Sequence, residues 1–252
     1  MKVAPQALDG TANEFAFVIP VYNHSKSMPW LVQAVSQYGF PVFVVDDGSD
    51  EETKSTLESL DGIVLLRHDT NMGKGAALLT GMSEAAKIAR WAITLDADGQ
   101  HDPRDAALLM AEAKNIHRGI IVGNRRGMLG PHIPWTSRFG RGFSNFWVRA
   151  SGGPKVSDTQ SGYRVYPLPE VLMWASRAHR FQWEVEILVL AHWHGVPIKE
   201  VPVSVNYEPK GIRISHFRPW VDFWRNSATF TGLIFKRIFL PRRKRAKLIP
   251  PP

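Results

Sequence analysis

The 252-residue chain contains no cysteine. This absence excludes structural disulfides and thiolate metal sites, and it fits a reducing compartment. Long hydrophobic runs are missing as well. The first dozen residues lack the apolar region of a signal peptide. The longest charge-free stretch near the C-terminus, residues 226–235, spans ten residues. A helix that spans a membrane needs about 20 apolar residues, so we expect no such helix here.

Acidic residues are scarce in the last part of the chain. From Pro209 to the end, eleven Lys and Arg accompany a single acid, Asp222, for a net charge of +10. The preceding 208 residues carry twenty Lys and Arg and twenty-two acids, for a net charge of −2. With 44% hydrophobic residues, the chain has enough apolar side chains for a full core. We therefore predict a slightly acidic globular domain followed by a basic tail.

Apolar runs of strand length alternate with segments of helix length in the first half of the chain. We predict strands at 15–20, 41–45, 63–67, 91–95 and 120–122, and helices at 29–38, 51–60 and 75–90. This alternation is typical of βαβ units, so the predicted fold is α/β with a mostly parallel central sheet flanked by helices. Beyond Gly123 the pattern loosens. There we predict a loop at 127–134, a helix at 139–150, a polar loop at 157–164, a helix at 184–193 and strands within 196–205.

Residues 96–100, Asp-Ala-Asp-Gly-Gln, directly follow the predicted strand 91–95. Ligands of open α/β sheets bind at the carboxyl ends of the strands. Asp96 and Asp98 can reach one divalent cation, and Gln100 offers a third oxygen. Mg²⁺ and Mn²⁺ prefer such ligands and keep positions open for phosphates. The stretch therefore predicts a metal site for a diphosphate, as in enzymes that use nucleotide sugars.

Two alternatives compete with a metal site at this stretch. Acidic residues after a strand often cap the next helix, as Asp102 before Pro103 is placed to do. The lettering also resembles a calcium loop, but no bidentate Glu follows at the required distance.

Polar groups also close the first two predicted strands. Residues 20–23, Pro-Val-Tyr-Asn, end the first strand, and residues 46–49, Asp-Asp-Gly-Ser, end the second. A carboxylate there can accept hydrogen bonds from a base or a ribose, and Tyr22 can stack on a base. A simple turn is the alternative for the Asp-Gly-Ser segment.

Residues 71–75, Asn-Met-Gly-Lys-Gly, precede a predicted helix. They do not form a Walker A loop, because His68 stands where that motif needs Gly and Gly75 where it needs Ser or Thr. The glycines and the helix N-terminus can still approach an anion. Lys74 can neutralise a phosphate, or it can be a solvated residue at the helix end.

Two further segments in the second half carry polar groups. In the predicted loop, Arg164 suits a bidentate contact with a phosphate, and Asp158 can act as a base or orient an acceptor. An ordinary loop is the alternative. Glu184 and Glu186 begin an apolar helix, where the helix dipole explains one acid better than two.

This ordered series of motifs resembles the family-2 glycosyltransferases, and within them the dolichyl- and polyprenyl-phosphate mannosyl- and glucosyltransferases. The similarity runs from about Phe15 to Tyr207. It implies a Rossmann-like GT-A fold over residues 14–208, in which 14–123 bind the nucleotide and 124–208 bind the acceptor. Residues 1–13 are then a flexible extension, and 209–252 a basic, membrane-associating tail.

The motifs and the resemblance together assign four groups of residues. The nucleotide sugar is expected at Pro20, Tyr22, Asn23, Asp46, Asp47, Ser49, Asn71, Gly73, Lys74, Asp96 and Ala97. The metal, Mg²⁺ or Mn²⁺, is expected on Asp96, Asp98 and Gln100. The acceptor is expected at Arg138, Arg141, Gln160, Ser161, Gly162 and Glu186. The expected catalytic residues are Asp98, Asp158, Arg164 and Glu184.

The predicted activity is inverting transfer of a sugar from a UDP- or GDP-sugar to a lipid acceptor. Polyprenyl phosphate is the first candidate acceptor, and another membrane lipid or envelope glycan precursor is the second. The resemblance leaves the base open, because His24 stands where related enzymes usually carry an acid. A hydroxyl acceptor would need a general base, for which Asp158 and Glu184 are candidates.

Two other classes of function compete with this prediction. One is a nucleotide-sugar or lipid-binding module without catalysis. The other is a nucleotidyltransferase, which would favour a glycine-rich loop where residues 22–25 stand.

The tail begins with a predicted amphipathic helix over residues 219–240. It carries Trp220, Phe223, Trp224, Phe230, Phe235 and Phe239, and a basic run at 242–247 follows. Such segments lie at the surface of anionic membranes. We therefore expect a cytoplasmic protein, peripheral on the cytoplasmic face of the membrane, with a membrane protein as a second candidate partner. The alternatives are aromatic side chains that pack on the catalytic domain and a tail for nucleic acid; we expect no nucleic-acid partner.

Overall fold

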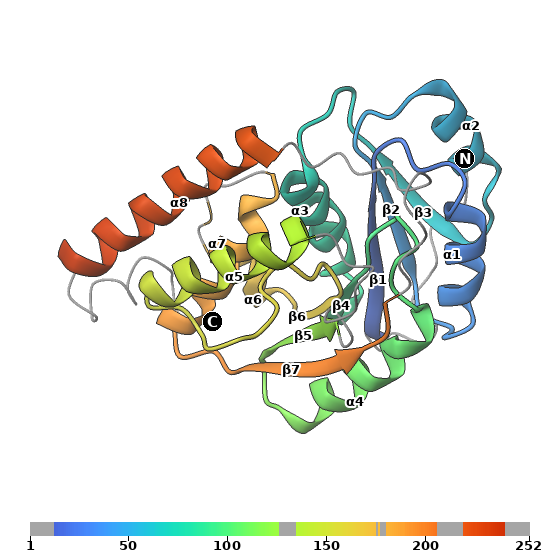
Figure 1. The fold of residues 1–252 in the computed structure, drawn as a ribbon. Helices are drawn as coiled ribbons and strands as arrows, with labels where there is room; N and C mark the ends of the chain where they lie inside the picture. The colour runs from blue at the N-terminus through green and yellow to red at the C-terminus, as the bar shows by residue number, and fades with distance from the viewer. Residues whose placement is uncertain (1–12, 126–134, 175, 177–179, 206–218, 240–252) are drawn as a thin grey trace.

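A computed structural model describes residues 13–125, 135–174, 176, 180–205 and 219–239. Seven strands form one sheet in the order β3-β2-β1-β4-β6-β5-β7, with helices on both faces (Figure 1). The strands are β1 Asn13–Val21, β2 Val42–Asp46, β3 Ile63–Arg67, β4 Ala89–Thr94, β5 Ile120–Arg125, β6 Arg164–Pro167 and β7 Ile198–Val203. The helices are α1 Met28–Ser36, α2 Glu51–Ser59, α3 Lys74–Ala85, α4 Ala106–Asn115, α5 Trp135–Ala150, α6 Glu170–Met173, α7 Gln182–Trp193 and α8 Pro219–Phe239, with a 3₁₀ turn, η2, at Pro103–Asp105.

The predicted fold class is confirmed. Strands β1, β2, β3 and β4 pair in parallel, as do β5 and β7. Strand β6 runs antiparallel to both of its neighbours and joins the two parallel parts into one sheet. The carboxyl ends of β1, β2 and β4 therefore meet at the same edge, where the sequence places its polar motifs.

The core lies on both faces of the sheet, and residues 15–21 of β1 are apolar without interruption. Its Phe15, Phe17 and Ile19 pack with α1 and α4, whereas Ala16 and Val18 pack with α3 and α7. This division follows from the twofold alternation of side chains along a strand. Both faces of a parallel strand are buried, which explains why the sequence shows a continuous apolar run.

Several element boundaries differ from the prediction. Helix α3 ends at Ala85 rather than near Arg90, because the carbonyl of Ile88 accepts the N–H of Asn13 and the chain enters β4 from Ala89. Helix α5 begins at Trp135, before the predicted start at 139, and α7 begins at Gln182, before the predicted start at 184.

Three further predictions concern the second half and the first residues. Strand β6 was not predicted; only its first residue, Arg164, belongs to the predicted polar loop. The alternation within 196–205 gives the single strand β7 and an isolated bridge at Val205. Strand β1 starts at Asn13, the last residue of the predicted extension. The predicted loop at 127–134 and residues 1–12 lie outside the described residues.

Helix α8 forms over nearly the predicted range and lies beside α5 and α7 (Figure 1). Its Phe230 and Leu233 are buried against the domain. Within the part of the chain that the structure describes, no helix is both long and apolar enough to cross a membrane.

Candidate active site

The ends of β1 and β2 are linked by hydrogen bonds at the carboxyl edge of the sheet. Asn23, at a φ of 57°, donates its N–H to Ser49 Oγ at 3.1 Å. Its Oδ1 accepts the N–H of Asp50 at 2.9 Å. Asn tolerates this left-handed conformation better than most residues do. The structure therefore brings the motif at 20–23 against the motif at 46–49; Pro20 and Tyr22 are both partly exposed there.

Asp46 and Asp47 shape this edge through their carboxylates. Asp46 is fully buried and accepts the N–H of Ser49 at 2.9 Å and Arg67 Nε at 3.1 Å. Asp47 accepts the N–H of Met72 at 2.9 Å and the N–H of Gly73 at 2.8 Å. The two acids thus fix the turn after β2 and the segment that leads into α3, and their contact with a nucleotide stays a prediction.

Gly48 explains how these segments come so close. Its φ is +73°, and a Cβ atom at this position would lie 2.6 Å from the carbonyl carbon of Thr70. Only glycine fits both the conformation and the space. The next residue along that segment, Asn71, is partly buried and accepts Arg180 Nη1 at 3.2 Å.

Lys74 connects three motifs that are far apart in the sequence. Its Nζ lies 2.6 Å from Asp96 Oδ1 and 2.8 Å from Glu184 Oε2. The three side chains are only 13%, 27% and 6% exposed. We call these residues the Lys74 triad. Lys74 is therefore not a solvated residue at the helix end, which corrects one of the two alternatives for it.

Two members of the triad, Lys74 and Asp96, hold each other in the charged form. Burial on its own would lower the pKa of Lys74, but Asp96 and Glu184 outweigh it and raise that pKa well above the usual value. Burial would raise the pKa of Asp96, but Lys74, with a smaller contribution from His101, holds it below the usual value. A positive charge is thus fixed between two carboxylates at the edge of the sheet.

Gly162 places the predicted acceptor loop directly on the triad. A Cβ atom at Gly162 would lie 2.5 Å from Asp96 Oδ2 and 2.5 Å from Lys74 Nζ. The carbonyl of Gly162 accepts Thr94 Oγ1 at 2.9 Å, which ties the loop to β4. The structure therefore brings together motifs that the sequence assigned separately to donor, metal and acceptor.

The predicted metal ligands lie partly exposed at this edge. Gln100 donates its N–H to Asp98 Oδ1 at 3.0 Å, and the carbonyl of the buried Ala97 accepts Ser27 Oγ. Two carboxylates and an amide oxygen are chemically suited to a hard divalent cation. Among the described residues, however, no group of three or more His, Cys, Asp or Glu is arranged to hold a metal. The metal assignment stays a prediction.

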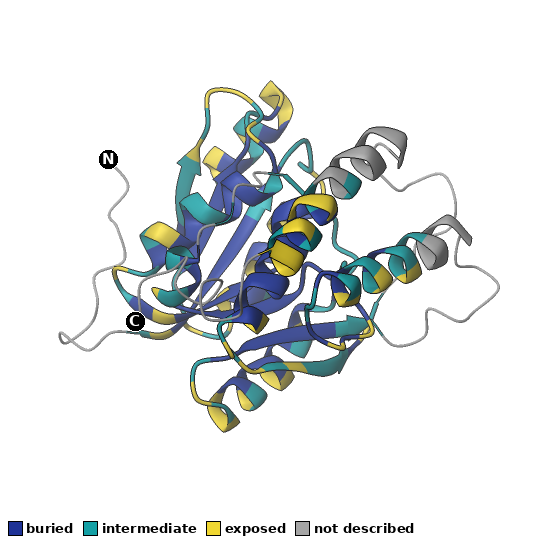
Figure 2. Ribbon diagram, turned by 90° about the vertical axis from the view of Figure 1, so that its left-hand side faces the viewer, coloured by how far each residue is buried: buried dark blue, intermediate teal, exposed yellow. Residues whose placement is uncertain are grey.

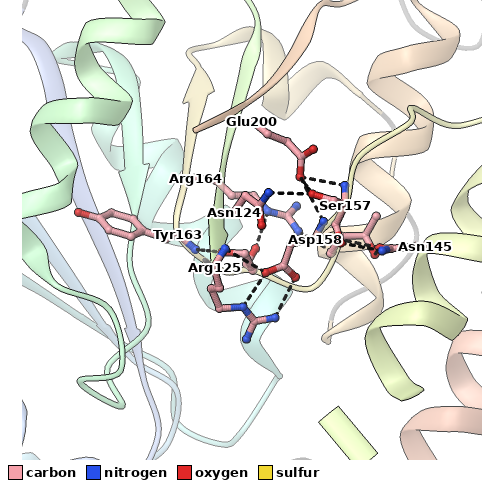
Figure 3. A network of polar contacts seen from close by, with 10 residues as sticks. Asn124, Arg125, Asn145, Ser157, Asp158, Tyr163, Arg164 and Glu200 are labelled. Carbon is pink, nitrogen blue, oxygen red and sulfur yellow. Dashed lines mark hydrogen bonds and ion pairs between the residues drawn. The ribbon is translucent and has the colours of Figure 1, made fainter. Parts of the chain in front are cut away.

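Asp158 is held in a buried ion pair (Figure 3). Its carboxylate is completely buried and accepts Arg125 Nε at 2.7 Å and Arg125 Nη2 at 2.9 Å. Burial would raise the pKa of Asp158, but Arg125 overcomes this and lowers it. A buried carboxylate with a lowered pKa and a bidentate partner is a poor general base. The geometry therefore argues against the catalytic role expected for Asp158.

Arg164 holds the predicted acceptor loop in place through hydrogen bonds to its backbone. It is completely buried, and its guanidinium donates to the carbonyls of Ser161 at 2.7 Å, Thr159 at 2.8 Å and Glu184 at 2.5 Å. This geometry corrects the expectation that Arg164 binds an acceptor phosphate. Its place is structural, since it ties the loop to the start of α7.

The remaining acceptor-side residues are distributed over the loop, α5 and α7. Gln160 and Ser161 lie in the loop, with Gln160 near the backbone of α5, and Arg141 of α5 helps to lower the pKa of Asp158. Glu186 is buried in α7 and accepts Ser176 Oγ at 2.7 Å. Arg138 belongs to α5, but its side chain lies outside the described part.

Three residues of this region were missed by the sequence analysis. Arg125 ends β5, just past the predicted strand, and Glu200 of β7 accepts the N–H of Ser157 at 2.9 Å and that of Asp158 at 3.2 Å (Figure 3). His101 is buried, and burial lowers its pKa to about 4 despite the opposing effect of Asp96. The position of His101 directly after residues 96–100 was the signal available for it.

Comparison with curated proteins gives relatives with similar sequences. An uncharacterized protein of Methanocaldococcus jannaschii is 31% identical over 202 residues, covering 77% of this chain and 82% of that protein. A UDP-N-acetylglucosamine–dolichyl-phosphate N-acetylglucosaminyltransferase of Methanococcus voltae is 29% identical and covers 75% and 84%. A dolichyl-phosphate beta-glucosyltransferase of Trichomonas vaginalis is 27% identical and covers 80% and 68%.

Comparison with solved structures supports the fold. The crystal structure of TarS residues 1–349 from S. aureus has a TM-score of 0.54 at 15% identity, covering 92% of this chain and 68% of that one. Rv0371c from Mycobacterium tuberculosis has a TM-score of 0.52 at 14% identity, covering 86% and 98%. The model of the family described as glycosyl transferase family 2 matches residues 16–168, from β1 to the residue after β6. The chain belongs to glycosyl transferase family 2.

Proposed function

We propose that this enzyme transfers a sugar from a nucleotide diphosphate sugar to a polyprenyl-phosphate or dolichyl-phosphate lipid, with inversion at the anomeric carbon. Two relatives with similar sequences are named for transfer to dolichyl phosphate, which supports this class of acceptor. The Lys74 triad joins the donor-side edge of the sheet to the acceptor loop, as transfer between two bound substrates requires.

One observation favours a phosphate over a hydroxyl as the attacking group. Both candidate bases, Asp158 and Glu184, are buried in ion pairs, with Arg125 and with Lys74 respectively. A hydroxyl acceptor must lose its proton to a base during the reaction. A phosphate monoester is already an anion at neutral pH, so its oxygen can attack without a base.

The reaction then follows from positioning and charge. A phosphate oxygen of the lipid bonds to the anomeric carbon while the bond from that carbon to the diphosphate breaks, and the diphosphate leaves with the bonding electrons. Attack from the face opposite the leaving group inverts the configuration. Lys74, at the N-terminus of α3, supplies a fixed positive charge near the site of the diphosphate.

A divalent cation is part of this proposal. Asp96, Asp98 and Gln100 would hold Mg²⁺ or Mn²⁺, which would neutralise negative charge on the leaving diphosphate. Lys74 occupies one oxygen of Asp96, so the second oxygen of that carboxylate and those of the other two residues would serve the ion.

The proposal is tested by offering one labelled nucleotide sugar at a time to two lipids that differ only in the phosphate. UDP- and GDP-sugars are incubated with polyprenyl phosphate or with polyprenol, and labelled lipid is extracted. We expect product from one donor with the phosphate and none with the alcohol. Transfer to polyprenol would contradict the argument from the buried bases. No product with any donor would favour a binding module without catalysis.

A pair of glycine variants links that activity to the site. Gly162→Ala introduces a Cβ atom 2.5 Å from the Asp96 and Lys74 side chains, whereas Gly142→Ala adds one on α5 with no atom within 4 Å. We expect the first variant to lose transfer at least about tenfold and the second to keep it. Equal activity of the two variants would contradict the placement of the site.

A further inference from the structure

The second half of α8 has one face that holds the helix on the domain. Phe230 and Leu233 are buried, and the Phe230 ring stacks on Trp147 of α5 with their centroids 6.2 Å apart. Arg237 donates Nη1 to the carbonyl of Ala150 at 2.5 Å, at the end of α5. Residues three, four and seven positions apart share one side of a helix, so these contacts define a single inner face.

The opposite face exposes three large apolar side chains near the end of the helix. Phe235, Ile238 and Phe239 are 56%, 68% and 71% exposed. The rings of Phe235 and Phe239 stack with their centroids 5.8 Å apart, and the spacing of three and four residues puts Ile238 beside them. We call these three residues the α8 patch. Adjacent exposed apolar side chains of this size mark an interaction surface.

Another exposed aromatic residue lies on the neighbouring helix. Phe146 of α5 is 62% exposed, and its ring packs edge-on against Trp147, on which Phe230 of α8 stacks. Figure 2 looks at the molecule from this side and shows α5 and α8 next to each other with exposed residues on both. Exposed aromatic side chains thus occur on both helices of a packed pair.

The charge around the α8 patch selects the kind of partner. Lys236 lies beside the patch on the helix, and residues 242–247, which follow it in the sequence, contain five Lys and Arg. Exposed aromatic side chains next to many cations are typical of helices that lie on anionic bilayers. Lys is depleted at the centre of protein interfaces, which makes a protein partner a poorer match.

We propose that the α8 patch inserts into the surface of an anionic phospholipid bilayer while Lys236 and the basic residues that follow α8 in the sequence contact the headgroups. The inner face keeps the catalytic domain attached to the inserted helix, so the active site is carried to the membrane. The inference rests on the proposed function in one respect: that function explains why membrane binding is useful, since it gives access to a lipid acceptor. Membrane binding can therefore be measured without turnover.

The test is cosedimentation of the full chain with vesicles of phosphatidylcholine alone and with added phosphatidylglycerol. Phe235→Asp and Ile238→Asp place a charge in the α8 patch. Leu108→Asp is the matched control, because Leu108 is 49% exposed on α4, away from the patch. All four proteins are compared by thermal unfolding, and since the replaced side chains are exposed we expect similar melting temperatures. If one patch variant unfolds early, the other carries the test.

The native chain and Leu108→Asp should bind the anionic vesicles, and each patch variant should bind them at least about tenfold more weakly. Equal binding by the native chain and the patch variants would overturn the proposal, as would failure of the native chain to bind anionic vesicles. A native dimer that the patch substitutions split into monomers would assign the surface to a second copy instead. Transfer to a detergent-dispersed acceptor should survive in the patch variants, and its loss in every protein would count against the proposed function alone.

Discussion

Replacing Lys74 by methionine tests the triad most directly. The substitution keeps a long side chain of similar volume and removes the positive charge of the Lys74 ammonium group. It leaves Asp96 and Glu184, 27% and 6% exposed, without the cation that lies 2.6 Å and 2.8 Å from their oxygens. The variant therefore contains two mostly buried negative charges close together.

The magnitude follows from the cost of unpairing buried charges. At an effective dielectric constant of about 20, each contact at this separation is worth about 6 kcal/mol before desolvation is subtracted. Removing one partner of a buried pair typically costs about 3–5 kcal/mol. For a chain of this length, each kcal/mol lowers the melting temperature by about 2–4 °C. We expect Lys74→Met to melt about 10 °C below the native protein at neutral pH.

Three comparisons isolate the charge as the cause. Lys87→Met removes an exposed pair, with Lys87 and Glu84 65% and 39% exposed, and should change stability by less than about 1 kcal/mol. Adding Glu184→Gln to Lys74→Met removes one stranded carboxylate and should restore part of the loss. Without Lys74, burial raises the pKa of Asp96, so in Lys74→Met this acid can bind a proton as the pH falls and the stability gap to the native protein should narrow. A calorimetric melting temperature equal to that of the native protein would refute the reasoning.

Three further predictions concern the surrounding residues. Arg125→Met should lower the free energy of unfolding in urea by about 3–5 kcal/mol, because it leaves the buried Asp158 carboxylate without its cation. Adding Asp158→Asn to that variant should recover part of the lost stability. An unchanged unfolding midpoint in Arg125→Met would count against the importance of the ion pair. Gly48→Ala, at a φ of +73° and 2.6 Å from Thr70, should destabilise by more than about 1 kcal/mol and weaken donor binding measured by calorimetry; native stability would contradict that close approach. His101 should bind a proton near pH 6.5 when unfolded but only near pH 4 when folded, so stability should fall by about 3 kcal/mol as pH drops through that window. His101→Phe should remove this part of the pH dependence of the urea midpoint, and an unchanged dependence would exclude His101 as its source.

The strands of the first half could be predicted from sequence because local pattern and final environment agree there. Strands β1 to β4 are short apolar runs, and the sheet buries them between helices on both faces. Strand β6 was missed because it has only four residues and begins with Arg164. An arginine indicates a loop or a ligand contact until the structure shows that β4 and β5 enclose it.

The meeting of the candidate motifs at one edge of the sheet could be predicted, whereas the pairing of their charges could not. Parallel topology alone brings the ends of β1, β2 and β4 to one edge. No local pattern shows that Lys74 will meet Glu184, because that contact depends on how α7 packs beside α3. For the same reason sequence does not distinguish a structural Arg164, bonded to three carbonyls, from one that binds a substrate.

The buried ion pairs also explain why the polar loop can serve a reaction without supplying a base. Asp158 fixes one end of the loop through Arg125, and Arg164 fixes the other through the carbonyl of Glu184. Between these two anchors, Gly162 rests on the Lys74 triad, where a Cβ atom would have no room. Asp158 and Arg164 both hold neighbouring segments in place, so between them the loop presents mainly backbone and uncharged side chains in fixed positions. Because Asp158 and Glu184 are held in ion pairs, the arrangement favours an acceptor that needs no base, and this is the physical reason to propose a phosphate rather than an alcohol.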